Sequence, residues 1–280
     1  MKGFWCAERE IYPSIFRVLL GMLLLFDLAF SFSSFEFIFD SKVNAFFPDA
    51  TFLKIIAEHY LIFIGIYAFS IFLWILGMGR NATSALVFVG YVMYFEMTGV
   101  LVTWGDVILK FSLFFFIFVN GFRYLSLGVT NDRTSLLSKL AVASIVLHLF
   151  LVYLSNAYFK ILDTSWQDGV GVYYSFAQYP NFESSFWFPI VANQFFGPLL
   201  NYFIILLQLL FVPLVLWRKS RKWVIFVSIL VHVAMAFQFG LWKFELIMLL
   251  LFGFVFNDAE WRTILPNKFH LKFFPKICDQ

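Results

Sequence analysis

Charged residues are scarce in this 280-residue sequence, where 13% of positions are Asp, Glu, Lys or Arg and 62% are hydrophobic. Soluble domains carry roughly 25% charged residues and about 45–50% apolar ones. A soluble chain of this length needs a polar surface around one or two cores, and too few charges are present to make one. We therefore expect an all-α integral membrane protein with a single transmembrane domain over residues 1–280.

Cysteine is nearly absent as well. Cys6 and Cys278 are the only two, at opposite ends of the chain, and no C-x-x-C or Cys/His spacing occurs. This excludes a disulfide scaffold and a structural zinc site, and we expect no metal. No basic patch is interleaved with aromatic residues, so no nucleic-acid partner is expected. The first apolar stretch lacks a small-x-small cleavage site and carries Arg17 and Asp27, which favours a retained helix over a signal peptide.

Long apolar runs fill the rest of the sequence. About 20 apolar residues are needed to cross a hydrocarbon core of roughly 30 Å. Counting such runs predicts a polytopic helix bundle with about eight transmembrane helices, two of which, the fourth and the eighth, are short. The predicted spans are 13–33, 58–78, 83–103, 106–123, 136–159, 195–217, 223–241 and 244–257.

Lysine and arginine predict the orientation, because cytoplasmic loops carry an excess of them. With both termini inside and eight crossings, most of the 20 basic residues are cytoplasmic, including the cluster at residues 218–222. The longest connections, residues 34–57 and 160–194, then lie outside. The second is rich in aromatic residues and too apolar for a free loop. We expect it to lie in the interface or to fold back over the bundle.

Ionisable residues at membrane depth are costly unless paired, so each is a candidate site. Arg17 and Asp27 share the first helix, about 15 Å apart along its axis, too far to pair with each other. The favoured interpretation of Arg17 is an anchor that reaches the inner interface. Asp27 lies deeper, and we expect it to have a partner inside the protein.

Five further polar residues fall in or beside the spans. Asp106 and Lys110 are four residues apart on one helix face, and the carboxylate lies at the helix N-terminus, where the dipole favours it. Capping with pairing and a site role are left as equal alternatives. Glu96 lies near the same level. His148 and His232 lie on different helices, and a hydrogen-bonded packing role is favoured over a base or a ligand.

The densest polar signal follows the fifth span. Lys160 stands at the membrane boundary, and Trp166, Asp168 and Gly169 follow it within ten residues. A boundary lysine is usually an anchor, but this mixture suits a fixed turn that caps a bundle. A lysine removed from water against aromatic rings can serve as a base.

The stretch Lys160-x5-Trp166-x-Asp168-Gly169, with Tyr173-Tyr174 after it, resembles the signature of the HTTM family. That family is the membrane domain shared with vitamin K-dependent gamma-carboxylase. Residues 17–28, 104–109 and 232–240 are similar to the family's first helix, its Gly-Asp helix start and its histidine-led seventh span. Within the family the chain is most similar to members of the sporulation-delaying protein B type.

The resemblance implies an HTTM-type bundle in a bacterial cytoplasmic membrane. It also implies help in the maturation or export of a secreted antimicrobial or toxin peptide, with a peptide precursor and a small partner protein. Lys160 would be the candidate base, with Asp106 and His232 as further catalytic candidates. A gamma-carboxylase-like enzyme with a lysine base and a quinol is one alternative. A non-enzymatic scaffold or transporter is another, so whether the chain is an enzyme is left open.

Overall fold

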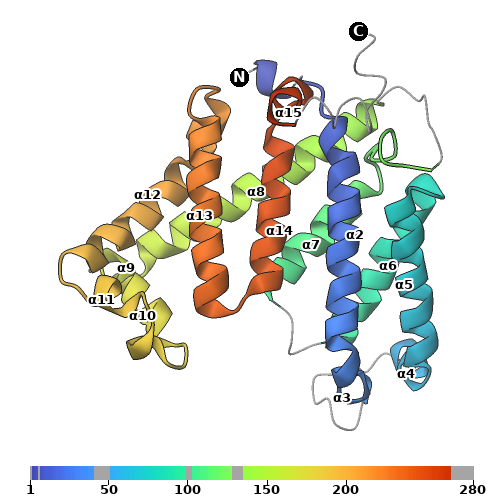
Figure 1. Cartoon of the computed structure of the whole chain (residues 1–280), viewed down its shortest axis with the longest axis horizontal. Coiled ribbons are helices and arrows are strands. Elements are labelled where there is room, and N and C mark those ends of the chain that lie inside the picture. The colour runs from blue at the N-terminus through green and yellow to red at the C-terminus, as the bar shows by residue number, and fades with distance from the viewer. Residues whose placement is uncertain (1, 6, 41–50, 99–102, 128–134, 266–280) are drawn as a thin grey trace. The chain divides into compact units, whose positions relative to one another are not determined.

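The structure, a computed structural model, describes residues 2–5, 7–40, 51–98, 103–127 and 135–265 (Figure 1). Every regular element in these ranges is a helix, which confirms the all-α prediction. Contacts divide the chain into two compact units, one of residues 147–245 and the other of residues 2–146 with 246–280. Helices α8 (Leu136–Leu162) and α14 (Trp242–Phe252) continue from one unit into the other. The single-domain expectation stays a prediction.

The unit of residues 2–146 with 246–280 is a series of packed helices. Helix α2 packs on α5, α5 on α6 and α6 on α7, and Figure 1 shows α2 and α5 side by side. Leu20, Trp74 and Val87 are fully buried in it. Its elements are α1 (Lys2–Trp5), α2 (Ile11–Ser31), η1 (Phe32–Ser34), α3 (Phe35–Phe39), α4 (Thr51–Glu58), α5 (Tyr60–Leu76), α6 (Arg80–Thr98), α7 (Trp104–Phe116), η4 (Gly253–Val255) and α15 (Asp258–Ile264).

The unit of residues 147–245 has a helical hairpin at its centre, formed by α12 and α13. Four short helices precede the hairpin and pack on α12. One part of α8 and one part of α14 belong to this unit. Its other elements are α9 (Thr164–Gln167), α10 (Gly171–Ala177), η3 (Phe182–Ser184), α11 (Phe188–Val191), α12 (Phe196–Leu216) and α13 (Arg221–Phe239).

Residues 163–195, which we call the cap segment, form a folded layer. Val172, Phe182 and Val191 are its buried centre, and aromatic side chains from the same segment pack around them together with Leu200 and Ile204 of α12. The expectation that this stretch is too apolar for a free loop and folds back onto the helices is confirmed.

All eight predicted helices occur, each within about five residues of the predicted start, but their lengths differ. Among the described residues, four helices are long and apolar enough to cross a membrane: Ile11–Phe39, Leu136–Leu162, Phe196–Leu216 and Arg221–Phe239. The pair α4 and α5, bent by 89°, would make a fifth. Helices α7 and α14 have 13 and 11 residues. At 1.5 Å per residue they rise about 20 Å and about 17 Å, less than the hydrocarbon core.

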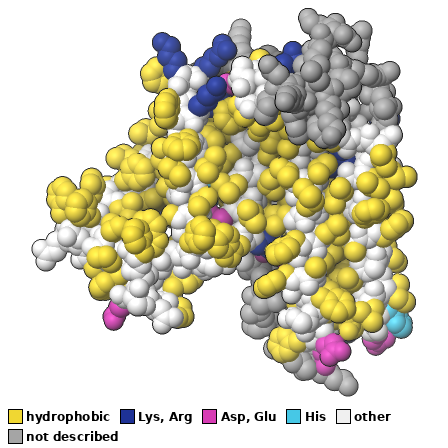
Figure 2. Space-filling view, in the orientation of Figure 1, with side chains coloured by type: hydrophobic (Ala, Val, Ile, Leu, Met, Phe, Trp, Pro, Cys, Tyr) yellow, Lys and Arg dark blue, Asp and Glu magenta, His cyan; other side chains and the backbone are white. Residues whose placement is uncertain are grey.

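Apolar side chains cover the surface of these helices (Figure 2). Phe26, Phe30, Ile62, Ile66 and Phe237 all expose more than half of their area. Soluble monomers rarely expose contiguous apolar patches of this kind, and such patches mark membrane or protein contacts. The surface is that of a membrane protein.

Candidate functional site

The turn that follows Lys160 is capped by its own side chains. The Asp163 carboxylate precedes α9 and accepts hydrogen bonds from the backbone N–H groups of Ser165 (2.8 Å) and Trp166 (3.4 Å), and from the Ser165 hydroxyl. The bond from the Ser165 hydroxyl is the largest cause that holds the pKa of this carboxyl below its ordinary value. Asp168 ends α9 as its C-cap. The predicted fixed turn is confirmed.

A buried asparagine on α12 holds the turn from below. Asn201 is fully buried. Its side-chain nitrogen donates to the Trp166 carbonyl oxygen (2.8 Å), and its oxygen accepts from the Val172 N–H (3.2 Å). The Tyr202 hydroxyl donates to the Gln167 carbonyl oxygen (2.7 Å). Both ends of the turn are therefore tied to one rigid helix.

Gly169 meets a steric requirement of the same turn. Its φ is +80°, in the left-handed region that favours glycine. A Cβ built on Gly169 would also lie 3.1 Å from the Pro198 side chain. The turn and α12 therefore approach closely here, and this is the structural reason for a glycine at this position.

Lys160 lies in the last turn of α8, just before the cap segment, and its Nζ lies 4.7 Å from the centre of the Trp166 ring. An ammonium over an indole face is a favourable cation–π contact, worth about 0.5–1 kcal/mol where it is exposed and more where water is excluded. The lysine is therefore held against the cap segment. Its predicted closeness to the aromatic residues of this stretch is confirmed for Trp166.

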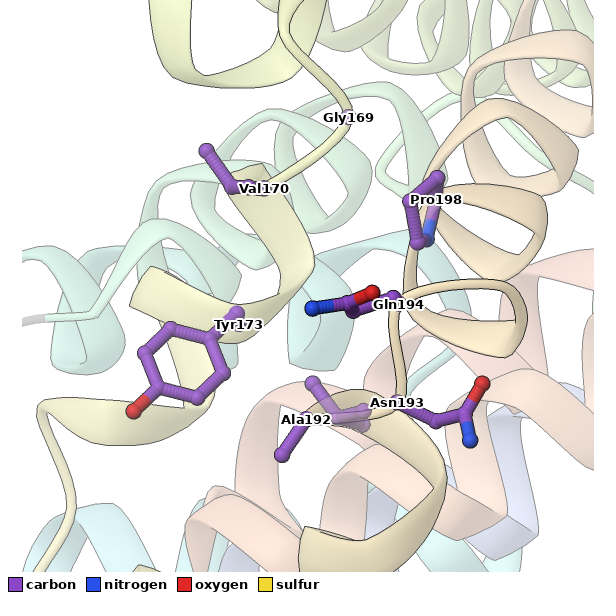
Figure 3. Close-up of a pocket in the computed structure, with 8 residues that line it drawn as sticks. Gly169, Val170, Tyr173, Ala192, Asn193, Gln194 and Pro198 are labelled. Atoms are coloured by element: carbon purple, nitrogen blue, oxygen red, sulfur yellow. The ribbon is translucent and has the colours of Figure 1, made fainter.

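A cavity of about 270 Å³ opens between the cap segment and the start of α12. It is lined by Gly169, Val170, Tyr173, Val191, Ala192, Asn193, Gln194 and Pro198. Figure 3 shows the Gln194 side chain pointing from its loop toward α10, which carries Tyr173. Tyr173 packs edge-on against Phe182 and Tyr174, and Tyr174 is 56% exposed. The walls are largely apolar. Their polar side-chain groups are the Tyr173 hydroxyl and the Asn193 and Gln194 amides, and the Asn193 oxygen already accepts from the N–H groups of Phe195 and Phe196.

A second polar group lies in the same unit, around His232. The His232 Nε2 is 3.0 Å from the Tyr153 hydroxyl, and its Nδ1 contacts the Glu245 carboxylate. All three are buried, with exposures of 8% for His232, 5% for Tyr153 and 1% for Glu245. The expectation of a hydrogen-bonded histidine is confirmed. No carboxylate partner was assigned to His232 from the sequence, because Glu245 lies on the next helix, after the turn at Gly240.

Asp106, in the other unit, is a helix cap. It forms a capping box with Thr103, whose backbone N–H and hydroxyl both lie 2.8 Å from Asp106 Oδ2. The Tyr91 hydroxyl donates to Oδ1 (2.8 Å). The capping part of the first alternative is thus confirmed. The predicted approach of Asp106 to Lys160 stays a prediction, because the two residues belong to different units.

Lys110 has a different contact from the one expected. Its Nζ lies 3.7 Å from a Glu96 carboxylate oxygen and 4.1 Å from the centre of the Phe95 ring. Both charged side chains are partly exposed, which makes the pair a modest contributor to stability. It joins α6 to α7.

Arg17 is not an interfacial anchor, and that interpretation was wrong. Its side chain is fully buried. The guanidinium donates to five backbone carbonyl oxygens, those of Trp74, Ile75, Gly121, Tyr124 and Leu125. An arginine has five N–H donors, so every one of them is used. The last carbonyl oxygens of α5 have few helical partners: that of Trp74 accepts from the Gly77 N–H, and Arg17 supplies a donor to those of Trp74 and Ile75.

Asp27 and His148 are both half-buried. Asp27 lies on α2 and interacts electrostatically with Tyr67 and Tyr91, which supports its predicted surroundings inside the protein. His148 lies on α8, five residues before Tyr153. Among the described residues, no group of three or more His, Cys, Asp or Glu side chains could hold a metal ion.

No protein-family model, no curated protein and no solved structure matches the chain. Function is therefore argued from the residues and their geometry, together with the resemblance given above.

Proposed function

We propose that this chain is an integral protein of the bacterial cytoplasmic membrane that assists the maturation or export of a secreted antimicrobial or toxin peptide. The observation that carries the proposal is the cap segment: a folded layer, tied to α12 by Asn201, with an apolar cavity beside it and Lys160 at its edge. A free loop would offer no fixed surface to a peptide.

The cavity chemistry suits an extended peptide. Its apolar walls can bury one or two side chains, and the Gln194 amide can donate to or accept from a peptide backbone. Lys160 adds a cation that can contact a carboxylate or a carbonyl oxygen of the substrate. A small partner protein belongs to the proposal through the resemblance alone.

Orientation is part of the proposal. The hairpin turn carries Arg218, Lys219, Arg221 and Lys222, and Figure 2 shows basic side chains gathered where α12 and α13 meet. Phe239, at the other end of α13, packs on Phe176 and Tyr179 of the cap segment. The 19 residues of α13 rise about 27 Å, close to the thickness of the hydrocarbon core. With the basic turn inside, the cap segment faces outside.

We further propose the HTTM-type arrangement with eight crossings and both termini in the cytoplasm. Helices α6, α7 and α14 would be its shorter or more polar members. An even number of crossings supports this, because it places most basic residues on one side.

A gamma-carboxylase-like reaction is the second candidate, and the contact between Lys160 and Trp166 bears on it. A cation–π contact stabilises the ammonium, whereas a lysine base must lose its proton. The geometry favours Lys160 as a substrate-contacting cation. We derive no step through a quinol.

Mass spectrometry of secreted peptides, from cells with and without the gene, tests the proposal. We expect one peptide to change in mass or to disappear when the gene is removed, and Lys160→Ala to reproduce that change. Lys160→Arg, which keeps the charge, should retain most of the function if the residue is a contacting cation. Lys222→Arg, an exposed change in the hairpin turn, is the matched control. Identical peptide profiles with and without the gene would contradict the proposal.

A further inference from the structure

Tyr153, His232 and Glu245 form a continuous hydrogen-bonded chain of side chains, which has no role in the proposed peptide function. The chain runs from the Tyr153 hydroxyl to His232 Nε2, and from His232 Nδ1 to Glu245 Oε2. Each side chain comes from a different helix: α8, α13 and α14. All three belong to the unit of residues 147–245.

His232, at the centre of this hydrogen-bonded chain, lies deep within α13, and Glu245 lies in the first turn of α14. His232 is the twelfth of the 19 residues of α13, about 17 Å from the start of that helix. Both α8 and α13 are long and apolar enough to cross a membrane. An ionised carboxylate at such a depth is costly unless it is paired. Glu245, at 1% exposure, therefore needs compensation for its charge.

Only one of the two carboxylate oxygens of Glu245 has a hydrogen-bond partner. Glu245 Oε2 contacts His232, whereas the buried Oε1 has no hydrogen-bond partner. A neutral imidazole leaves the pair with a net charge of −1. One added proton turns it into an imidazolium–carboxylate pair with no net charge, which costs less in a low-dielectric interior.

Contacts also fix where that proton must go. A carboxylate accepts hydrogen bonds and does not donate them, so a neutral His232 carries its hydrogen on Nδ1, facing Glu245. Nε2 is then an acceptor, and the Tyr153 hydroxyl donates to it. When a proton adds to Nε2, this hydrogen bond reverses and the Tyr153 oxygen accepts.

We propose that Tyr153, His232 and Glu245 form a membrane-embedded proton-binding site, in which His232 Nε2 takes up one proton and releases it. Water supplies the proton and receives it again, so no redox partner is required. The charge of the site changes from −1 to zero on binding. This proposal does not depend on the peptide function, and it stands or falls separately.

The side chains around Tyr153, His232 and Glu245 favour a proton over a metal ion as the ligand. The Tyr153 ring stacks on Phe211, with 3.7 Å between the ring centres, and the His232 ring packs against Phe244. Ser228 lies buried beside Tyr153, one turn before His232 on α13. A metal ion would lack ligands, since no group of three such side chains occurs in the described part of the chain.

The other ionisable groups of these helices stand at other positions along them. On α8, His148 lies about 7.5 Å before Tyr153 along the axis, and Tyr158 and Lys160 lie beyond it. Arg221 and Lys222 stand at the start of α13. On α14, Lys243 lies two residues before Glu245, which turns it about 200° away around the helix. Within this unit, α12 contributes Tyr202, which donates to Gln167 instead.

Nitrogen NMR of the purified full-length protein in lipid nanodiscs, with ¹⁵N-labelled histidine, tests the proposal. The His232 signal is assigned by its loss in His232→Gln. We expect a neutral ring protonated on Nδ1 at high pH and a ring protonated on both nitrogens at low pH. Glu245→Gln should remove the preference for Nδ1 and shift the titration of the His232 signal. His148→Gln, on the same helix as Tyr153, should leave both unchanged.

Two results would overturn the proposal. One is a neutral His232 ring that carries its hydrogen on Nε2 in the wild-type protein. The other is a His232 signal that does not change over the pH range in which the protein stays folded. Both are read from the wild-type spectrum, so they decide the matter even if Glu245→Gln fails to fold.

Discussion

Asn201 shows what a single residue contributes to the cap segment. It is fully buried in α12 and serves one carbonyl oxygen and one N–H of the turn above it. Sequence reasoning identified the turn at Lys160–Gly169 but missed Asn201, which lies more than 30 positions later within an apolar run. Glu245 was missed for the same reason: only the path of the chain brings it to His232.

Replacing Asn201 with alanine should loosen the cap segment. The carbonyl oxygen of Trp166 and the N–H of Val172 would both lose a buried partner, at a cost of about 1–3 kcal/mol for each group left unsatisfied. We expect faster limited proteolysis within residues 163–195 and a lower melting temperature in detergent. Asn156→Ala, an exposed change on α8 that removes one hydrogen bond within that helix, is the control. Equal proteolysis of the two variants would contradict this role for Asn201.

Asp258 gives stability a pH dependence of known sign. Its carboxylate accepts from the N–H groups of Glu10 (2.9 Å) and Ile11 (3.0 Å) at the start of α2. Burial raises the pKa of Asp258, partly offset by the hydrogen bond from Ile11. The folded protein therefore holds this proton at a higher pH than the unfolded chain, and this group's contribution to stability falls as pH rises above about 4.

The variant Asp258→Asn cannot titrate at this position. It should lower the free energy of unfolding by about 1 kcal/mol, because an amide nitrogen, which cannot accept, replaces one of the two oxygens that accept from the N–H groups of Glu10 and Ile11. The loss should be larger at pH 4 than at pH 7, since the wild-type protein gains stability as Asp258 becomes protonated. Unfolding by denaturant in detergent at both pH values measures this. A loss that grows with rising pH would contradict the sign.

At the scale of elements, the sequence predicted the positions of the helices well. The apolar runs and the breakers between them define the helices; Gly77, for example, ends α5 with a φ of +74°. The sequence predicted the lengths of the helices and the partners of buried polar side chains less well. Whether α7 spans a membrane depends on its neighbours, and the burial of Arg17 depends on carbonyl oxygens from segments about 57 to 108 residues away. Hydropathy contains no information about such contacts.

Arg17 joins three segments: α2, the end of α5 and the residues after α7. Arg17→Met keeps a long apolar side chain but leaves several carbonyl oxygens buried without donors. We expect the free energy of unfolding to fall by at least about 3 kcal/mol. Folded yield by size-exclusion chromatography in detergent would show it as a large loss.

Arg17→Lys has fewer donors and should give an intermediate yield. Arg218→Met removes an exposed arginine of the hairpin turn and serves as the control. A yield for Arg17→Met equal to that of Arg218→Met would show that Arg17 does not join these segments.

At the scale of the whole molecule, the account requires the cap segment to face outside, where a secreted peptide can reach it. The basic residues 218–222 and the cap segment lie at opposite ends of α13, which is long and apolar enough to cross a membrane. Thiol accessibility in intact cells measures this directly. Cys6 and Cys278 are first replaced by serine, and single cysteines are placed at Ser184 and Ser220. The account predicts that an impermeant thiol reagent labels the cysteine at position 184 in intact cells, and the one at position 220 only after permeabilisation. The reverse pattern would contradict it.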